Sequence, residues 1–551
     1  MDSLRRVFLR WGNCDVCRRI AEWEFRLSYL SKPKPRRSGL SLRMVRPSYI
    51  LRQARIQVDS SNIPHPSETD MATKLLILHG YSDGATSFIG LRDFFESSGY
   101  ARSDIFLLNY ASMDDQSDFT DFADKLDEDY AKQFAGERID VACHSTGALV
   151  VRLWLDLHFR RQRDESRATP RSPVRHLLMF APANFGSDLA EMGQSFLGKF
   201  RSTFFNSNRQ PGDFLESGRL VLQGLEPASP FQWSLSGRDL HGDGFFNPEL
   251  GAENVCFPFV LAAGKRYGGL QAQLIKDRKK PGTDGTVRIC GTSLNTRRCL
   301  IDFCAREVKP VWSEERKFPT IPFAIFGEFN HGTIIEGGDG FARSPGKFAL
   351  KALAVDSFER YQALATEYGQ FTQRNYGGDP YQQFFFKVRD DVGLPVLDYY
   401  IDFYAQLPDG TVHHKLTLEF DRMFEAEFYR HSADPSCRAL MLNLARLREY
   451  FRRLKSAGAR LVFDVCANSP IKEIRYLPGH AVIFDGDSPD EGPMFLFENT
   501  TTLVEIVLNR IASDQVLHLV NFDLTRLQLP PTDASTSASG RARLLSGPAK
   551  K

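Results

Sequence analysis

Residues 139–147 read IDVACHSTG, and this stretch decides the fold. The apolar run Ile139–Ala142 predicts a short buried strand, and helical spacing resumes from about Thr146. The turn between strand and helix is therefore tight and carries Ser145 at its tip. Such a turn needs small residues because the two backbones approach closely; Gly147 fits, whereas Cys143 stands where a first glycine is usual. The stretch predicts a nucleophile elbow, in which the Ser145 hydroxyl projects above the edge of a sheet.

Short apolar runs alternate with helical segments on both sides of this turn. Strands are expected at Leu75–Leu78, Ile105–Leu108, Leu177–Phe180, Phe257–Ala263 and Ile321–Phe326, with helices near 117–133 and 146–159. Short buried strands separated by helices predict a mostly parallel sheet with helices on both faces, which is the α/β class. Together with the elbow, this pattern indicates an α/β-hydrolase fold over residues 71–350. Residues 183–256, rich in Gly, Phe, Ser and Asn, are too many for a plain connection and are interpreted as a cap insertion.

An activated serine needs a base and an acid that orients the base, and in this fold they follow it in the order Ser, Asp or Glu, His. Asp284 lies in a GTDGT turn after the strand expected at 257–263. His331 lies one short loop after the strand expected at 321–326. The pattern predicts Ser145, Asp284 and His331 as a catalytic triad, in which His331 takes the hydroxyl proton and Asp284 fixes the His331 tautomer.

A developing oxyanion requires backbone N–H donors beside the serine. The helix that starts after the elbow offers the N–H of Thr146, with Gly147 allowing the close turn. The loop after the first strand contains His79, Gly80 and Tyr81, and we expect the N–H of Tyr81, or of Ser82, to be the second donor.

Other residues compete for these roles. His144 adjoins the nucleophile and is expected to pack inside the elbow, and His241 with Asp243 is expected to order a turn in the cap. His413 and His414 fall beyond residue 350. The segment Ala181–Ser187 closes the strand after the elbow; whether it borders an acyl pocket or is only a strand exit stays open at this point.

The pattern changes after about residue 350, where a β-rich, sandwich-like domain is expected over 351–529. A chain of 551 residues, 42% of them hydrophobic, has room for such a second core. A DG turn at 409–410 is expected to join two of its strands, and one amphipathic helix is expected near 438–455. Residues 530–551 are predicted to be a disordered tail. The expected strands are Phe384–Val388, Leu397–Tyr404, His414–Phe420, Phe424–Tyr429, Arg460–Val465, Ala481–Phe484, Met494–Phe497 and Leu503–Leu508.

The N-terminal 70 residues form a basic extension, since residues 1–57 hold 14 Lys and Arg against four Asp and Glu. Helically spaced apolar residues within 1–30 fit an interfacial amphipathic helix. Residues 31–70 resemble a linker, and Met71 directly precedes the first expected strand. An arm that contacts membranes, a flexible arm and a misassigned start of translation all remain open.

Several function classes are disfavoured by the composition. The nine cysteines are scattered and odd in number, which is typical of reduced thiols, and the pair Cys14 and Cys17 lacks partners for a zinc site. We therefore expect neither a metal nor a cofactor. No run of 18 apolar residues predicts a transmembrane helix, and the N-terminus lacks the pattern of an ordinary signal peptide. The basic extension without a recognisable module does not indicate nucleic-acid binding.

These motifs together resemble those of the bacterial PlaB-type phospholipases A. The resemblance is carried by His144–Gly147, His79–Tyr81, Ala181–Ser187, Asp284-Gly285 and Asn330-His331, and by a hydrolase domain followed by a β-rich domain. It covers about residues 74–525. The family elbow typically begins with Thr, so Cys143 departs from it, and the extension 1–70 is not part of the pattern.

The resemblance implies hydrolysis of glycerophospholipids and lysophospholipids through an acyl-enzyme on Ser145, without a catalytic metal. It also implies a bacterial protein with peripheral membrane association and possible homo-oligomerisation. The alternative is a soluble, cytoplasmic carboxylesterase or triglyceride lipase that uses the same triad. The intact Ser145, Asp284 and His331 disfavour a hydrolase fold kept as a non-catalytic scaffold.

Overall fold

Six parallel strands form the central sheet of the first half of the chain. The computed structural model describes residues 74–78, 88–108, 117–165, 169–188, 190, 219–268, 281–313, 318–424, 428–485 and 496–512. The sheet has the order β2-β1-β3-β4-β5-β8, and every neighbouring pair is parallel. Its strands are β1 (Leu75–Leu78), β2 (Ile105–Leu108), β3 (Ile139–His144), β4 (Val174–Phe180), β5 (Phe257–Ala263) and β8 (Phe323–Phe326). The expected α/β class is confirmed. The extension 1–70, the tail 530–551 and the loop His79–Tyr81 lie outside the described residues.

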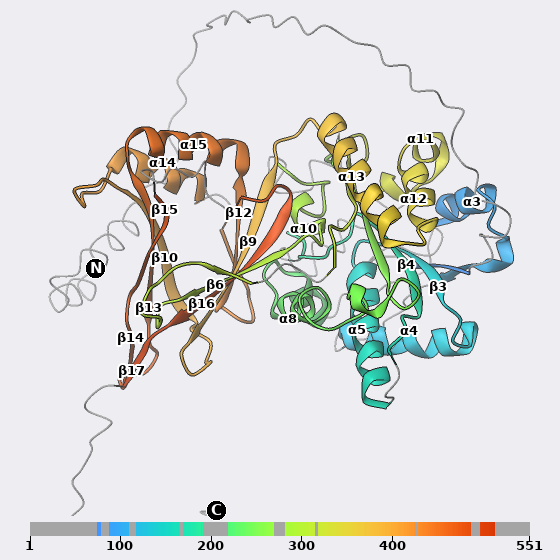
Figure 1. Cartoon of the computed structure of the whole chain (residues 1–551), viewed down its shortest axis with the longest axis horizontal. Coiled ribbons are helices and arrows are strands. Elements are labelled where there is room, and N and C mark those ends of the chain that lie inside the picture. Colours follow the sequence, from blue (N-terminus) through green and yellow to red (C-terminus); the bar gives the residue numbers. More distant parts are fainter. Residues whose placement is uncertain are drawn as a thin grey trace, which may run out of the picture. The chain divides into compact units, whose positions relative to one another are not determined.

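Helices cover both faces of this sheet (Figure 1). One side carries α4 (Phe119–Phe134) and α5 (Gly147–Glu165), which follows the elbow directly. The other side carries α3 (Ile89–Ser97), α11 (Gly338–Arg343), α12 (Pro345–Leu353) and α13 (Phe358–Asn375). All residues of β1, β3 and β5 are buried, as expected for strands covered on both faces.

The segment between β4 and β5 leaves the sheet and returns through two helices, α7 (Arg219–Leu225) and α8 (Pro230–Asp239). A buried ion pair fastens α8 to α5: the Arg152 guanidinium donates to Asp239 at 2.7 and 3.0 Å. Both side chains are buried, at 0% and 4% exposure. Burial raises the pKa of Asp239, although the adjacent Arg152 opposes that shift.

We predict that Asp239→Leu alone destabilises the protein by about 3–5 kcal/mol, because it leaves the Arg152 charge buried without its partner. The double variant Arg152→Met/Asp239→Leu should recover much of that loss. Urea unfolding of the three proteins measures both values, and a double variant no more stable than the single one would contradict this account.

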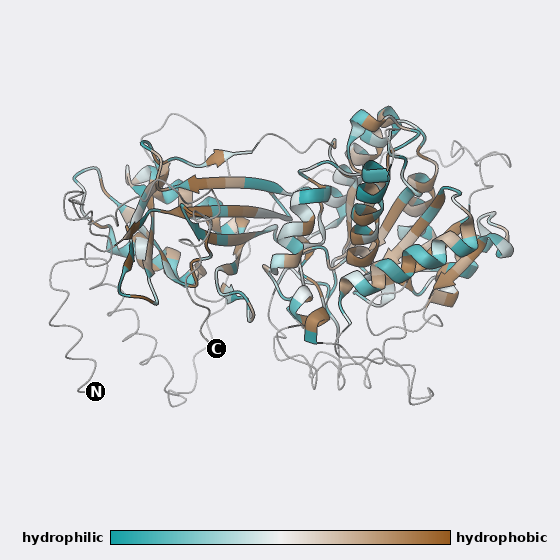
Figure 2. Ribbon diagram, turned by 90° about the horizontal axis from the view of Figure 1, so that it is seen from below, coloured by the Kyte–Doolittle hydropathy of each residue, from teal (hydrophilic) through white to brown (hydrophobic). Residues whose placement is uncertain are grey.

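Two sheets and two helices enclose a second core in the C-terminal half. The larger sheet has the order β11-β12-β9-β16-β6-β7, in which β6 spans Arg297–Asp302 and β7 spans Val311–Trp312. The smaller, antiparallel sheet has the order β10-β13-β15. Apolar side chains from both sheets and from α14 and α15 form one cluster. The expected β-rich domain is therefore present, with mixed and antiparallel sheets (Figures 1 and 2). Its elements are β9 (Tyr381–Asp390), β10 (Asp398–Gln406), α14 (His414–Phe424), β11 (Phe428–Arg430), β12 (Cys437–Asn443), α15 (Leu444–Ser456), β13 (Arg460–Asn468), β14 (Ile474–Tyr476), β15 (Gly479–Asp485), β16 (Thr500–Leu508) and β17 (Arg510–Ala512).

Four expectations for local structure in this half are wrong. Residues 414–420 form helix α14 and not a strand, because Leu416 and Phe420 are buried at helical spacing. The DG turn does reverse the chain, with the Leu407 N–H donating to the Thr411 carbonyl at 2.8 Å, but a helix follows it. The helix expected from 438 begins at Leu444, since the preceding residues form β12. Residues 496–497 are not a strand, and 494–495 lie outside the described residues.

The position expected for the domain boundary, at residue 350, does not separate the two halves. Helix α13 packs on the hydrolase sheet, where the Tyr361 hydroxyl donates to the Pro258 carbonyl at 2.7 Å. Conversely, two strands that precede residue 350 belong to the larger C-terminal sheet: β6 (Arg297–Asp302) and β7 (Val311–Trp312). Strand β6 pairs in parallel with β16, which lies about 200 residues later.

The larger C-terminal sheet is buried on both faces where β9 and β16 run side by side. Phe384 and Val504 belong to the second core, whereas their neighbours Phe385 and Leu503 belong to the core of the hydrolase half. The Phe385 ring lies 5.8 Å, centroid to centroid, from that of Phe185, which follows the strand after the elbow. The sheet thus serves as a shared wall between the two halves.

We predict that a chain ending at residue 350 does not reach the native fold. It loses α13, the strand β16 that pairs with β6, and Phe385 of β9, which packs against Phe185. Size-exclusion chromatography and thermal unfolding would show aggregation or a non-cooperative transition, with the full-length chain as control. A monomeric, cooperatively unfolding fragment would contradict the shared wall.

Candidate active site

The elbow has the geometry that its sequence predicts. Strand β3 ends at His144 and helix α5 begins at Gly147, which leaves Ser145 in the left-handed region with φ of 54°. A residue with a side chain adopts this region rarely, and it does so here because the turn must reverse within two residues. The Ser145 N–H donates to the Phe180 carbonyl of β4 at 3.1 Å, so the turn is held from the side.

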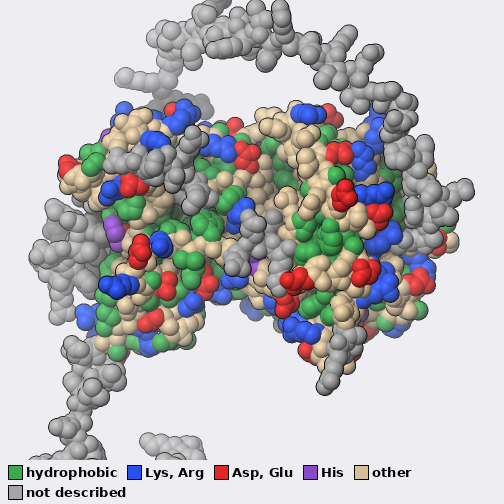
Figure 3. All heavy atoms as spheres, viewed as in Figure 1, with side chains coloured by type: hydrophobic (Ala, Val, Ile, Leu, Met, Phe, Trp, Pro, Cys, Tyr) green, Lys and Arg blue, Asp and Glu red, His purple; other side chains and the backbone are tan. Residues whose placement is uncertain are grey.

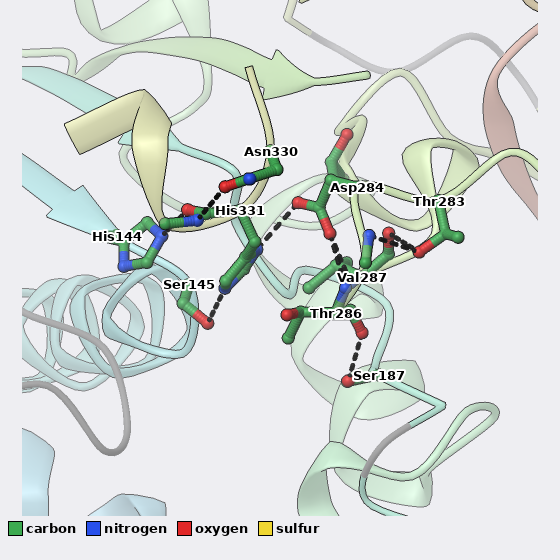
Figure 4. Close-up of polar contacts among 12 residues, drawn as sticks. His144, Ser145, Ser187, Thr283, Asp284, Thr286, Val287, Asn330 and His331 are labelled. Carbon is green, nitrogen blue, oxygen red and sulfur yellow. Dashed lines mark hydrogen bonds and ion pairs between the residues drawn. The ribbon is translucent and has the colours of Figure 1, made fainter. Parts of the chain in front are cut away.

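The His331 ring reaches the serine from the loop after β8 (Figure 4). Its Nε2 lies 3.0 Å from Ser145 Oγ, which is a hydrogen-bond distance. Asn330 stabilises the conformation of this loop. Its side-chain oxygen accepts hydrogen bonds from the N–H groups of Gly332 and Thr333 at 3.1 and 2.9 Å. Ser145 and His331 are 8% and 6% exposed, so both lie close to the surface but are largely enclosed.

Asp284 completes a continuous chain of hydrogen bonds. Its Oδ2 lies 2.7 Å from His331 Nδ1, and its Oδ1 accepts from the backbone N–H groups of Thr286 and Val287 at 2.9 and 2.7 Å. The carboxylate is 1% exposed and is oriented by these partners. Gly285, with φ of 105°, lies where an added Cβ would come within 2.3 Å of the Tyr267 ring, so glycine is required there.

A backbone hydrogen bond also joins the two loops, because the His331 N–H donates to the Asp284 carbonyl at 3.2 Å. The arrangement can move a proton from the serine hydroxyl to an imidazole whose far nitrogen donates to a carboxylate.

His144 supports the histidine loop and does not compete with it. Its Nε2 lies 2.9 Å from the His331 carbonyl oxygen, and the two rings lie 4.6 Å apart. Its side chain is therefore packed inside the elbow. Cys143 is also inert as a nucleophile, since burial and the neighbouring Cys256 raise the pKa of its thiol.

The other candidate histidines lie elsewhere. His241 Nε2 is 2.9 Å from the Thr296 hydroxyl, in the same bend as Asp243. His413 accepts from the Leu416 N–H at 3.4 Å, and His414 starts α14. The structure brings none of them to Ser145.

Of the expected oxyanion donors, Thr146 is placed between Ser145 and the start of α5 and is 5% exposed. Its position at the N-terminus of a long helix favours a negative charge beside it. His79, Gly80 and Tyr81 lie outside the described residues.

The segment Ala181–Ser187 contacts the acid loop, a role that sequence analysis left open. The Ser187 hydroxyl donates to the Thr286 carbonyl at 2.6 Å, and Arg288 forms an ion pair with Asp188. A serine after glycine in a loop gives no signal for this contact, because its partner is about 100 residues away.

Among the described residues, no cluster of His, Cys, Asp or Glu could hold a metal ion, and Cys14 and Cys17 lie outside this set. The seven described cysteines are all free thiols.

The order of the parallel strands, with the elbow after β3 and the acid and histidine loops after β5 and β8, defines an α/β-hydrolase fold. No family model and no curated protein sequence matches the chain. Solved structures do match it. Phospholipase PlaB from Legionella pneumophila superposes with a TM-score of 0.65 at 23% identity, covering 82% of this chain and 97% of PlaB.

A second PlaB structure, in complex with thio-NAD, gives a TM-score of 0.64 at 22% identity, over 82% of this chain and 96% of that one. The mature form of Bacillus licheniformis lipase BlEst2 gives a TM-score of 0.32 at 16% identity, covering 51% of this chain and 92% of the lipase. The similarity to PlaB confirms the expected resemblance at the level of the fold, and its coverage spans both halves of the chain.

Proposed function

We propose that the protein is a serine hydrolase that cleaves carboxylic ester bonds. The observation that carries this proposal is the unbroken hydrogen-bond chain from Asp284 through His331 to Ser145. A non-catalytic scaffold would have little use for these hydrogen bonds. It would also have no reason to keep the left-handed backbone of Ser145, which costs conformational energy that packing alone does not require.

In the proposed reaction, Ser145 Oγ attacks the ester carbonyl while His331 Nε2 accepts its proton. Asp284 stabilises the imidazolium, and the N–H of Thr146, with that of Tyr81, stabilises the oxyanion. His331 then returns the proton to the leaving alcohol, which leaves an acyl group on Ser145. A water molecule, deprotonated by the same imidazole, releases the carboxylic acid and restores the serine.

For the substrate, we propose glycerophospholipids and lysophospholipids, so that the enzyme is a phospholipase A and lysophospholipase. The shared fold with a protein named as a phospholipase, across both halves, supports this choice over a carboxylesterase or triglyceride lipase. Peripheral contact with a bacterial membrane and homo-oligomerisation belong to the same proposal. No helix among the described residues is long and apolar enough to cross a bilayer.

Nucleic acid is not among the proposed partners. On the face seen in Figure 3, basic and acidic side chains are interspersed over the described residues.

We predict that Ser145→Ala and His331→Ala lower turnover of p-nitrophenyl butyrate about 10⁴-fold or more, the scale of triad removals. Asp284→Asn should lower it comparably or somewhat less. Labelling by a fluorophosphonate probe, present in the wild type and lost in Ser145→Ala, checks the nucleophile independently. Near-normal turnover in Asp284→Asn would contradict the role of Asp284 as the catalytic acid.

We predict that the wild type releases fatty acid from vesicles of phosphatidylcholine or phosphatidylglycerol more efficiently than it cleaves short p-nitrophenyl esters. Fatty-acid release and p-nitrophenol release, compared as kcat/KM, measure this preference, with Ser145→Ala as the blank. Activity confined to short esters or to triglyceride emulsions would favour the carboxylesterase or triglyceride lipase.

A further inference from the structure

The position of Asp284 depends on a short helix that directly follows its loop. Helix α10 (Ile289–Thr292) starts five residues after Asp284, and the Ile289 N–H donates to the Gly282 carbonyl at 2.9 Å, which closes the loop. All four residues of α10 are buried. Because the loop is anchored at this end, a shift of α10 would displace the carboxylate from His331.

Helix α10 rests on the C-terminal sheet through a polar contact. The Thr501 hydroxyl lies 3.2 Å from the Cys290 carbonyl oxygen and 3.2 Å from Gln383 Oε1. Gln383 Oε1 in turn lies 3.1 Å from where a Cβ on Gly291 would be, so the helix and the sheet approach each other closely at this glycine. Burial raises the pKa of the Cys290 thiol to about 12, so this group stays neutral and adds no competing charge.

Gln383 and Thr501 are fixed by the sheet that carries them. They are paired across strands β9 and β16, and they are 4% and 0% exposed. Buried polar groups need their partners to be correctly placed, which makes such a contact specific in direction as well as favourable. Sheet residues also hold a neighbour more rigidly than loop residues do.

A second series of contacts links the C-terminal half to the acid loop. Glu226, which follows α7, accepts from the Tyr429 hydroxyl at 2.6 Å and from the Ser432 hydroxyl at 2.7 Å. The preceding Leu225 carbonyl accepts from the Ser187 N–H at 2.8 Å. Ser187 then holds the Thr286 carbonyl at 2.6 Å, while the Thr286 N–H donates to Asp284.

We propose that the C-terminal half positions the catalytic acid, with Gln383 and Thr501 as positioning residues that act through α10. The contacts through Glu226 and Ser187 support the same loop at Thr286. This inference rests on the proposed function, since it assigns a role to residues that touch neither the substrate nor the triad.

The test compares two adjacent threonines of β16. Thr501→Val keeps the shape of the side chain and removes the hydroxyl that reaches α10. Thr502→Val is the matched control, because Thr502 is equally buried, at 0%, but its hydroxyl accepts from Gln382 at 2.8 Å within the sheet. Thr501→Ser restores the hydroxyl.

With p-nitrophenyl butyrate, and with active sites counted by fluorophosphonate labelling, Thr501→Val should lower kcat about tenfold, since a small displacement of a catalytic group is costly. Its KM should stay within about twofold of the wild type because the binding groups are intact. Thr501→Ser and Thr502→Val should retain kcat close to that of the wild type. Equal losses in Thr501→Val and Thr502→Val would overturn the proposal.

A double-mutant cycle shows whether the effect passes through Asp284. In an Asp284→Asn background, the further change Thr501→Val should lower the residual kcat less than about twofold, because residues that act as a unit are non-additive. The same tenfold loss in both backgrounds would overturn the proposal. Tyr429→Phe, at the half-buried end of the second contact, provides an independent variant and should lower kcat with KM unchanged.

The outcomes separate this proposal from the proposed function. A wild type with no turnover of any ester and no labelling overturns both. An active wild type whose kcat is unchanged in Thr501→Val and in Tyr429→Phe overturns only the positioning role.

Discussion

The structure depends on one constraint: parallel strands all end at the same edge of their sheet. Because β3, β5 and β8 are parallel, the loops that follow them lie together although they are far apart in the chain. Ser145, Asp284 and His331 are the residues these loops place in contact. Each loop is then fixed locally: the elbow by its left-handed serine, the acid loop by two backbone N–H groups, and the histidine loop by Asn330.

The larger C-terminal sheet extends this organisation beyond the hydrolase sheet. Its strands β9 and β16 present alternate residues to two different cores, so that Phe385 packs with the hydrolase half and Phe384 with the other. Because closely packed interiors deform little, a displacement of this sheet would also displace the side chains packed against it in both cores. The second half is therefore part of the hydrolase and not an appended module.

Sequence reasoning succeeded where the signal was local. Every strand of the parallel sheet contains a short apolar run, and the elbow, the acid turn and the histidine loop follow their strands in a fixed chain order. It failed where neighbours distant in the chain decide the outcome. The sequence pattern of residues 414–420 favours a strand, but in the structure Leu416 and Phe420 share one buried face of a helix. Residues 437–443 are held as a strand by pairing with β9, which no local pattern reveals. Gln383 and Thr501 carry no motif at all. The carbonyl that Thr501 contacts, that of Cys290, lies about 210 residues earlier in the chain, and the hydrogen-bond partner of Gln383 is Thr501 itself.

The parallel pairing of β6 with β16 has a consequence for how the protein is made. Strand β6 leaves the ribosome between Asp284 and His331, but the strand beside it, β16, is synthesised about 200 residues later. Since domains fold as units while the chain emerges, the nascent polypeptide must wait with its central wall open until residue 508 has cleared the exit tunnel. Translation thus sets the earliest moment at which the sheet can close. A chain released before residue 508 lacks part of the strand that pairs with β6.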